Sequence, residues 1–89
     1  MVISRQGNWL TAMVDDELVM MSAESGNYLG LSAIGARIWE LLESPQELEV
    51  VCDQLQREFE VSPEICRTEV EAFLTDLATH GAVTLKSAA

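Results

Sequence analysis

The spacing of the apolar residues changes once along the chain, at Ser32, and this change constrains the fold more than any other feature. Before Ser32, β-branched and aromatic residues alternate with short turns, a pattern typical of strands. After Ser32, apolar residues recur at three- and four-residue intervals, as in amphipathic helices. Because 89 residues suffice for only one core, the strands and helices must pack on each other.

Three short strands are predicted before Ser32. Residues 9–14 and 17–23 flank an Asp-Asp turn, which folds them into a hairpin. A second turn at residues 24–27 contains glycine and asparagine, which adopt positive φ at little cost, and it leads into a third strand over residues 27–31. Alternation divides the third strand between two faces, with Leu29 and Leu31 on one and Tyr28 and Gly30 on the other.

Three helix-start signals follow. Ser32 is the expected cap of a helix through about residue 43. Ser44, followed by proline and then by a glutamate, predicts a second start, and Ser62 before Pro63 predicts a third helix that Gly81 ends. The expected inward residues are Ile34, Ile38, Leu41 and Leu42 on the first helix, Leu48, Val51, Cys52, Leu55 and Phe59 on the second, and Cys66, Val70, Phe73, Leu74 and Leu77 on the third.

This order predicts an α+β fold, a winged helix-turn-helix-like domain in which a three-stranded antiparallel sheet is followed by three helices. The whole chain, residues 1–89, is expected to form one domain, with an ordered core over about residues 8–86. Residues 82–86 are expected either to form a short last strand or to trail off, and residues 87–89 to fray.

Catalytic and cofactor chemistry has no visible basis in the chain, which predicts a protein that is not an enzyme. His80 is the single histidine, it falls where a helix ends, and no nucleophile stands in a recognisable arrangement with it. Cys52 and Cys66 lie in apolar helical patterns and are expected to be buried free thiols. The glycines form no nucleotide-binding loop and the carboxylates fall on polar helix faces, so we expect no cofactor and no metal.

The charge of the chain narrows the class of partner. The net charge is −10 and only five basic residues are scattered along the sequence, whereas nucleic-acid binding depends on Lys and Arg that neutralise phosphates. A DNA-binding winged helix therefore stays only as an alternative, and a cationic peptide is a more natural partner. No apolar run approaches the length of a membrane span and no secretory signal begins the chain, so we expect no membrane partner and a cytoplasmic location.

The third strand is the best candidate for a binding site. If it lies at the sheet edge, its free N–H and C=O groups would let an extended peptide add as a further strand. Two other interpretations remain open. The strand can be an ordinary edge protected by its shortness, or it can pair with a second copy of the chain.

Residues 24–42 resemble the PqqD family. They read Glu-Ser-Gly-Asn-Tyr-Leu-Gly-Leu-Ser-Ala-Ile-Gly-Ala-Arg-Ile-Trp-Glu-Leu-Leu, a glycine turn, a tyrosine-leucine strand and a helix with an Ile-Trp-x-Leu-Leu core. Residues 55–64 and 70–77 resemble the rest of the family pattern, so the likeness spans nearly the whole chain. Its specificity comes from strand, helix and spacing together, because no single motif is unique.

The resemblance implies a RiPP recognition element, which binds the leader segment of a ribosomally made precursor peptide along its third strand and against its third helix. It further implies delivery of the precursor to a separate enzyme, first a lasso-peptide leader peptidase, with a PqqD-type chaperone for a radical-SAM enzyme as the alternative. Leu29, Leu31 and the inward positions of the third helix are explained equally well as core. The implied peptide-binding residues are Asn27, Tyr28, Leu29, Gly30, Leu31, Arg67, Glu69, Val70, Phe73, Leu74, Asp76 and Leu77.

Overall fold

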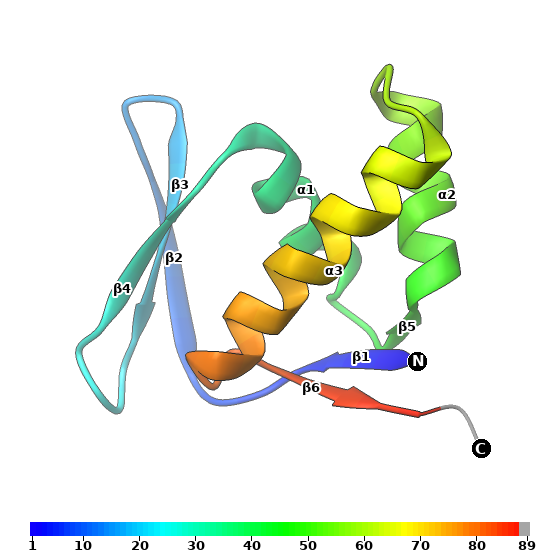
Figure 1. Cartoon of the computed structure of the whole chain (residues 1–89). Coiled ribbons are helices and arrows are strands. Elements are labelled where there is room, and N and C mark those ends of the chain that lie inside the picture. Colours follow the sequence, from blue (N-terminus) through cyan, green and yellow to red (C-terminus); the bar gives the residue numbers. More distant parts are fainter. Residues whose placement is uncertain (88–89) are drawn as a thin grey trace.

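A computed structural model describes residues 1–87 of the chain (Figure 1). The helices lie on one side of the sheet formed by residues 9–31, and α3 runs across the front of the molecule between that sheet and α2. The elements in order are β1 (Val2–Arg5), β2 (Trp9–Val14), β3 (Glu17–Ser22), β4 (Tyr28–Leu31), α1 (Ala33–Leu41), β5 (Gln46–Glu47), α2 (Leu48–Glu58), α3 (Pro63–Thr79) and β6 (Val83–Lys86).

The three predicted strands form one antiparallel sheet in the order β2-β3-β4. The β2–β3 turn consists of Asp15 and Asp16, whose φ angles of 50° and 68° give the left-handed turn that suits the twist of a two-residue hairpin. The predicted hairpin is confirmed, and β4 lies at an edge of this sheet. Residues 88 and 89, part of the tail expected to fray, lie outside the described residues.

A second sheet, in the order β5-β1-β6, was not expected. Strand β1 pairs with β6 over its whole length, and Ile3 at its centre is fully buried. The expected ordered core of residues 8–86 therefore begins too late, because the first residues belong to the core. Of the two outcomes expected for residues 82–86, the structure shows the strand.

The predicted start of the second helix at Ser44 is wrong. The two residues of β5 pair with β1, Gln46 opposite Ile3 and Glu47 opposite Val2, so the backbone there is extended. Helix α2 begins only at Leu48, and Glu47 at its cap position makes no side-chain cap hydrogen bond. Pairing with the N-terminal strand, a contact across more than 40 residues, overrides the local serine-proline signal.

The other two helix starts are confirmed. The Ser32 hydroxyl accepts a hydrogen bond from the Gly35 N–H at 3.2 Å, and the Ser62 hydroxyl accepts one from the Ile65 N–H at 3.3 Å. At the end of α3, Gly81 has a φ of +77°, a conformation that glycine adopts without strain. Among residues 1–87, no helix is both long and apolar enough to cross a membrane.

One core joins both sheets to the helices. Met20 and Leu31 of the β2-β3-β4 sheet, each no more than 5% exposed, pack in the same cluster as the inward residues of α1, α2 and α3. The helices therefore cover one face of that sheet, as predicted. The buried members of the cluster are Ile3, Met20, Leu31, Ile38, Trp39, Leu42, Leu48, Val51, Cys52, Leu55, Cys66, Val70, Leu74, Leu77, Ala82 and Val83.

Candidate functional site: the β4 edge and the α1–α3 cavity

The free edge of β4 presents the backbone groups of alternate residues. In the hairpin that joins β3 to β4, the Ser22 N–H donates to the Asn27 carbonyl at 2.7 Å, so this pair is hydrogen-bonded. Bonded and non-bonded pairs alternate along an antiparallel ladder, which directs the N–H and C=O of Leu29 toward β3. The N–H and C=O groups of Tyr28 and Gly30 therefore point to the open edge.

A cavity of about 240 Å³ lies beside the residue at which β4 ends. Its walls come from the start of α1 and from the middle of α3, and they are mostly apolar. Glycine at position 35 permits this arrangement, because the Phe73 ring lies only 3.2 Å from the place a Cβ would occupy. The lining residues are Ser32, Ile34, Gly35, Ile38, Glu69, Val70 and Phe73.

Ile34 does not lie in the core as predicted. It is 37% exposed, although its position on α1 was assigned to the inward face. It lines both this cavity and a smaller one of about 50 Å³ among α1, α2 and α3, which also shares Glu69 and Val70. An apolar side chain at the mouth of two adjoining cavities is a surface that a ligand can cover.

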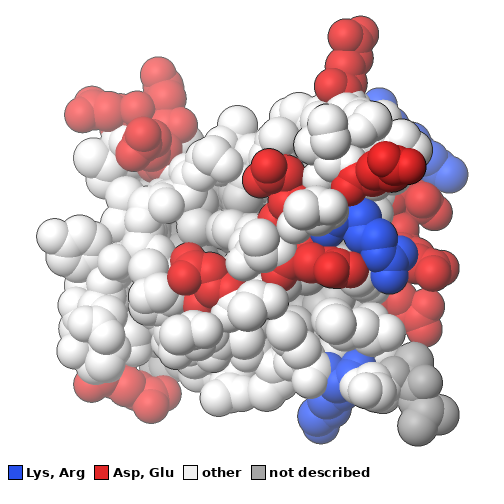
Figure 2. Space-filling view, viewed as in Figure 1, with Lys and Arg blue, Asp and Glu red and all other residues white. Residues whose placement is uncertain are grey.

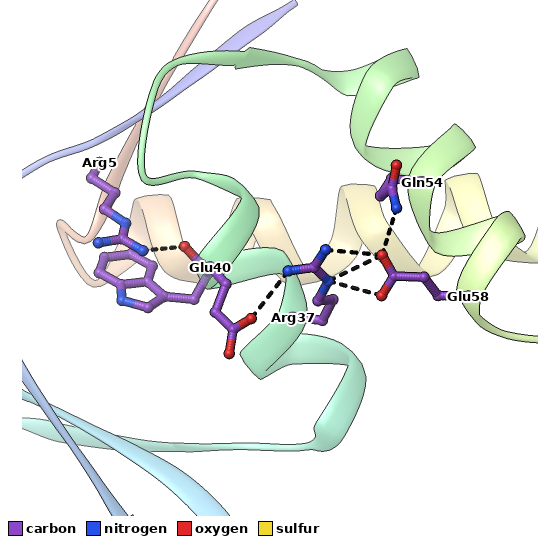
Figure 3. Close-up of polar contacts among 6 residues, drawn as sticks. Arg5, Arg37, Glu40, Gln54 and Glu58 are labelled. Atoms are coloured by element: carbon purple, nitrogen blue, oxygen red, sulfur yellow. Dashed lines mark hydrogen bonds and ion pairs between the residues drawn. The ribbon is translucent and has the colours of Figure 1, made fainter.

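Polar contacts hold α1 in the position that forms the cavity (Figure 3). The Arg37 guanidinium donates from Nε to the Glu58 carboxylate at the end of α2 at 2.8 Å and from Nη1 to Glu40 at 3.1 Å, while Gln54 also donates to Glu58. The hydrogen bond from Arg37, with that from Gln54, lowers the pKa of Glu58.

Arg5 of β1 fixes the other side of α1. Its guanidinium carbon lies 4.2 Å from the centre of the Trp39 ring, and it donates a hydrogen bond to the Trp39 carbonyl, so that α1 is tied to β1 as well as to α2. The helix that carries one wall of the cavity is therefore held at both flanks.

Nine of the twelve predicted site residues divide into three groups. Tyr28, Leu29 and Gly30 lie on the edge strand, and Tyr28 is 73% exposed. Glu69, Val70 and Phe73 line the cavity beside the end of that strand. Leu31, Leu74 and Leu77 are buried in the core, so their packing role is the one that the structure supports.

Asn27 and Arg67 are placed differently from the rest. The Asn27 carbonyl is already engaged by Ser22, and the residue precedes β4. Arg67 pairs with Glu71, Nε to Oε1 at 3.0 Å, and lines hollows with the first residues of α2. Arg67 therefore lies on the opposite flank of α3 from Glu69 and the cavity.

Asp76 is two turns beyond Glu69 on α3, on the cavity flank by helix periodicity, and its side chain is exposed. Its Oδ1 lies 3.7 Å from Nδ1 of His80, whose ring nitrogen also contacts the Asp76 carbonyl at 2.8 Å. His80 thus terminates α3 as expected and is occupied by its own helix.

The two cysteines are buried between α2 and α3 as free thiols, as predicted. Burial, aided by the neighbouring Cys66, raises the pKa of Cys52 to about 11. A thiol with so high a pKa carries almost no thiolate at neutral pH, which is the opposite of what a nucleophile needs. Within residues 1–87, no three carboxylate, histidine or cysteine side chains are grouped in a way that could hold a metal ion.

An α+β domain of the winged-helix type, with an open strand edge beside an apolar cavity, is the class that the geometry defines. The model of the family described as coenzyme PQQ synthesis protein D (PqqD) matches residues 17–83, three quarters of the sequence. The chain belongs to the PqqD family. No curated protein matches it.

Two solved structures share the fold over nearly their whole length. One, described as TbiB1 in complex with the TbiA(beta) leader peptide, is 30% identical, with a TM-score of 0.82 over 94% of this chain and 98% of that one. The other, a lasso peptide synthetase B1 complexed with the leader peptide, is 23% identical, with a TM-score of 0.80 over 93% and 98% of the two chains.

Proposed function

We propose that this chain binds the leader segment of a ribosomally made precursor peptide by adding it as a strand to β4. The observation that carries the proposal is the open edge at Tyr28 and Gly30, placed beside the α1–α3 cavity. The 30% identical relative, which has almost the same length and fold, was solved with a leader peptide. Because precursor peptides are made on ribosomes, the proposed place of action is the cytoplasm.

The added strand would draw affinity from two sources. Tyr28 and Gly30 would exchange backbone hydrogen bonds with it, and alternate peptide side chains would face α3. There an apolar side chain could enter the cavity between Ile34, Val70 and Phe73. Backbone pairing gives affinity for extended peptides in general, so the cavity supplies the selectivity.

We further propose that the chain delivers the bound precursor to a separate processing enzyme through the outer face of the β2-β3-β4 sheet. Strand register places Leu10, Met21 and Tyr28 in one row across this face, and they are 55%, 42% and 73% exposed. Monomeric proteins seldom leave an apolar row open across a whole sheet, whereas protein interfaces are rich in aromatic residues and methionine.

A lasso-peptide leader peptidase is the proposed recipient, since both solved relatives carry leader peptides and one is described as a lasso peptide synthetase B1. A radical-SAM enzyme is the alternative recipient, supported by the family description as a PQQ synthesis protein. In this proposal the chain is a binding adaptor without catalysis of its own.

The strand assignment can be tested with one variant and one matched control. Gly30→Pro removes the N–H that faces the open edge, and the Cβ that it adds meets nothing closer than Glu17 Oε2 at 3.9 Å. Thr11→Pro makes the same change on β2, the opposite edge of the same sheet. Leu29 is unsuitable, because its N–H is directed toward β3.

The ligand for this test is a fluorescein-labelled TbiA(beta) leader, the peptide with which the 30% identical relative was solved, titrated by fluorescence anisotropy. We expect Gly30→Pro to weaken binding about tenfold or more, through loss of a hydrogen bond and a clash with the peptide, and Thr11→Pro to leave it unchanged. Equal affinity of folded Gly30→Pro and the unaltered chain would overturn the proposal, and so would a loss confined to Thr11→Pro.

A further inference from the structure

The two flanks of α3 differ in charge, and only one of them faces the cavity. On the flank toward α2, the Arg67 guanidinium neutralises Glu71. On the cavity flank, Glu69 lines the cavity wall, and no cationic side chain among residues 1–87 lies within ion-pair distance of it. Asp76 follows on the same flank, and within residues 1–87 His80 is the one basic side chain near its carboxylate.

Two of the other four basic residues are engaged away from the cavity. Arg37 is held by Glu58 and Glu40, and Arg5 is stacked on Trp39. Acidic side chains accordingly spread over the α3 region in Figure 2, while the part over the sheet is almost uncharged apart from its turns. With a net charge of −10, the field around the cavity is negative.

We infer that the leader segment bound at this edge is cationic, with a Lys or Arg two residues from an apolar anchor. The inference rests on the proposed leader-binding function. An added strand directs every second side chain to the same face, about 7 Å apart. If an apolar side chain of the leader enters the cavity, the neighbouring side chain on the same face lies at the cavity rim. There the Glu69 carboxylate is within reach of the charged end of a Lys or Arg.

The carboxylates on the cavity flank should also make binding selective for basic leaders. A leader with Asp or Glu at the neighbouring position would be repelled by Glu69 and Asp76, with no nearby cation in the described part of the chain to offset the repulsion. Because the carboxylates are exposed, the attraction also acts on the association rate and weakens with salt.

The test is selection of binders from a phage-displayed library of random 12-residue peptides against the intact chain and against Glu69→Lys. Peptides selected on the unaltered chain are expected to carry Lys or Arg two positions from an apolar residue, and Glu69→Lys is expected to select Asp or Glu there. Glu71→Lys, the same charge change on the opposite flank, should retain the basic preference. A peptide selected on the unaltered chain should bind Glu69→Lys about tenfold more weakly.

Binding of the selected peptides to Gly30→Pro separates the charge preference from strand addition at β4. Peptides that lose binding to Gly30→Pro but show no charge preference would overturn the cationic inference and leave strand addition standing. Selected peptides that bind Gly30→Pro as well as the unaltered chain would instead count against the binding site itself. Equal shifts for Glu69→Lys and Glu71→Lys would assign the effect to net charge and contradict the role given to Glu69.

Discussion

The two faces of the β2-β3-β4 sheet consist of alternate residues of the same strands, yet the helices cover one face and leave the other exposed. Met20 and Leu31 on the inner face are buried under the helices, whereas Leu10 and Met21 on the outer face are about half exposed although both are apolar. Burial on one face accounts for the stability of the sheet. The outer face contributes little to it, and its apolar character fits the docking role proposed for it.

The largest expected effect lies on the inner face. Met20→Ala removes a fully buried side chain and leaves a cavity under α1, which should lower the free energy of unfolding by about 2 to 5 kcal/mol. Urea denaturation followed by circular dichroism measures this loss. A cost of only a few tenths of a kcal/mol would mean that the sheet is not part of the core.

On the outer face the prediction is reversed. The double variant Leu10→Ser and Met21→Ser should change the free energy of unfolding by no more than about 0.5 kcal/mol, because both side chains are already about half exposed and lie outside the core. It should weaken capture of the proposed partner, a lasso-peptide leader peptidase, about tenfold or more in a pull-down with purified proteins.

Leader affinity of the same double variant provides the control for that experiment. Leader binding uses the β4 edge, so its Kd should stay within about twofold of the unaltered chain. Equal loss of leader and enzyme binding would show that the outer face and the β4 edge form one site. That result would contradict the proposal that the leader and the enzyme bind to different surfaces.

The smallest expected effect concerns the ion pair between Arg37 and Glu58, which ties α1, the helix that contacts the inner face, to α2. The folded-state pKa of Glu58 is lowered by Arg37, so the stabilisation it contributes is present above the ordinary glutamate pKa and disappears as the pH falls through the folded value. Urea midpoints of the unaltered chain and Glu58→Gln should differ at pH 7, and the difference should shrink as the pH falls below the ordinary glutamate pKa. A difference that is the same in acid as at pH 7 would contradict this assignment.

The sequence predicted those parts of the fold whose signals are local. The Asp-Asp turn, the Ser32 and Ser62 caps and the helical stripes each depend on residues a few positions apart. Strand β1 has no such signal, because a four-residue strand is specified by partners more than 40 and about 80 positions away. The same pairing moved the start of α2 to Leu48, against a serine-proline signal that is correct at Ser62.

For the candidate site, the strand was easier to predict than the helix. Consecutive hairpins put the third predicted strand at an edge, whereas the flank on which Arg67 lies depends on how α3 is rotated against α1 and α2. Helix periodicity alone could have separated Arg67 from Glu69, since two residues along a helix are about 200° apart around its axis. The cavity wall at Ile34 required the packed helices and had no sequence signal.

Amide hydrogen exchange by NMR tests the central claim, strand addition at β4, most directly. In the free chain the amides of Tyr28 and Gly30 should exchange fast, while that of Leu29, bonded toward β3, is protected. Addition of the TbiA(beta) leader should slow exchange at Tyr28 and Gly30 and leave Thr11 and Met13, which face the β2 edge, unchanged. Protection that appears on β2, or none on β4 when the chain is saturated with leader, would contradict the account.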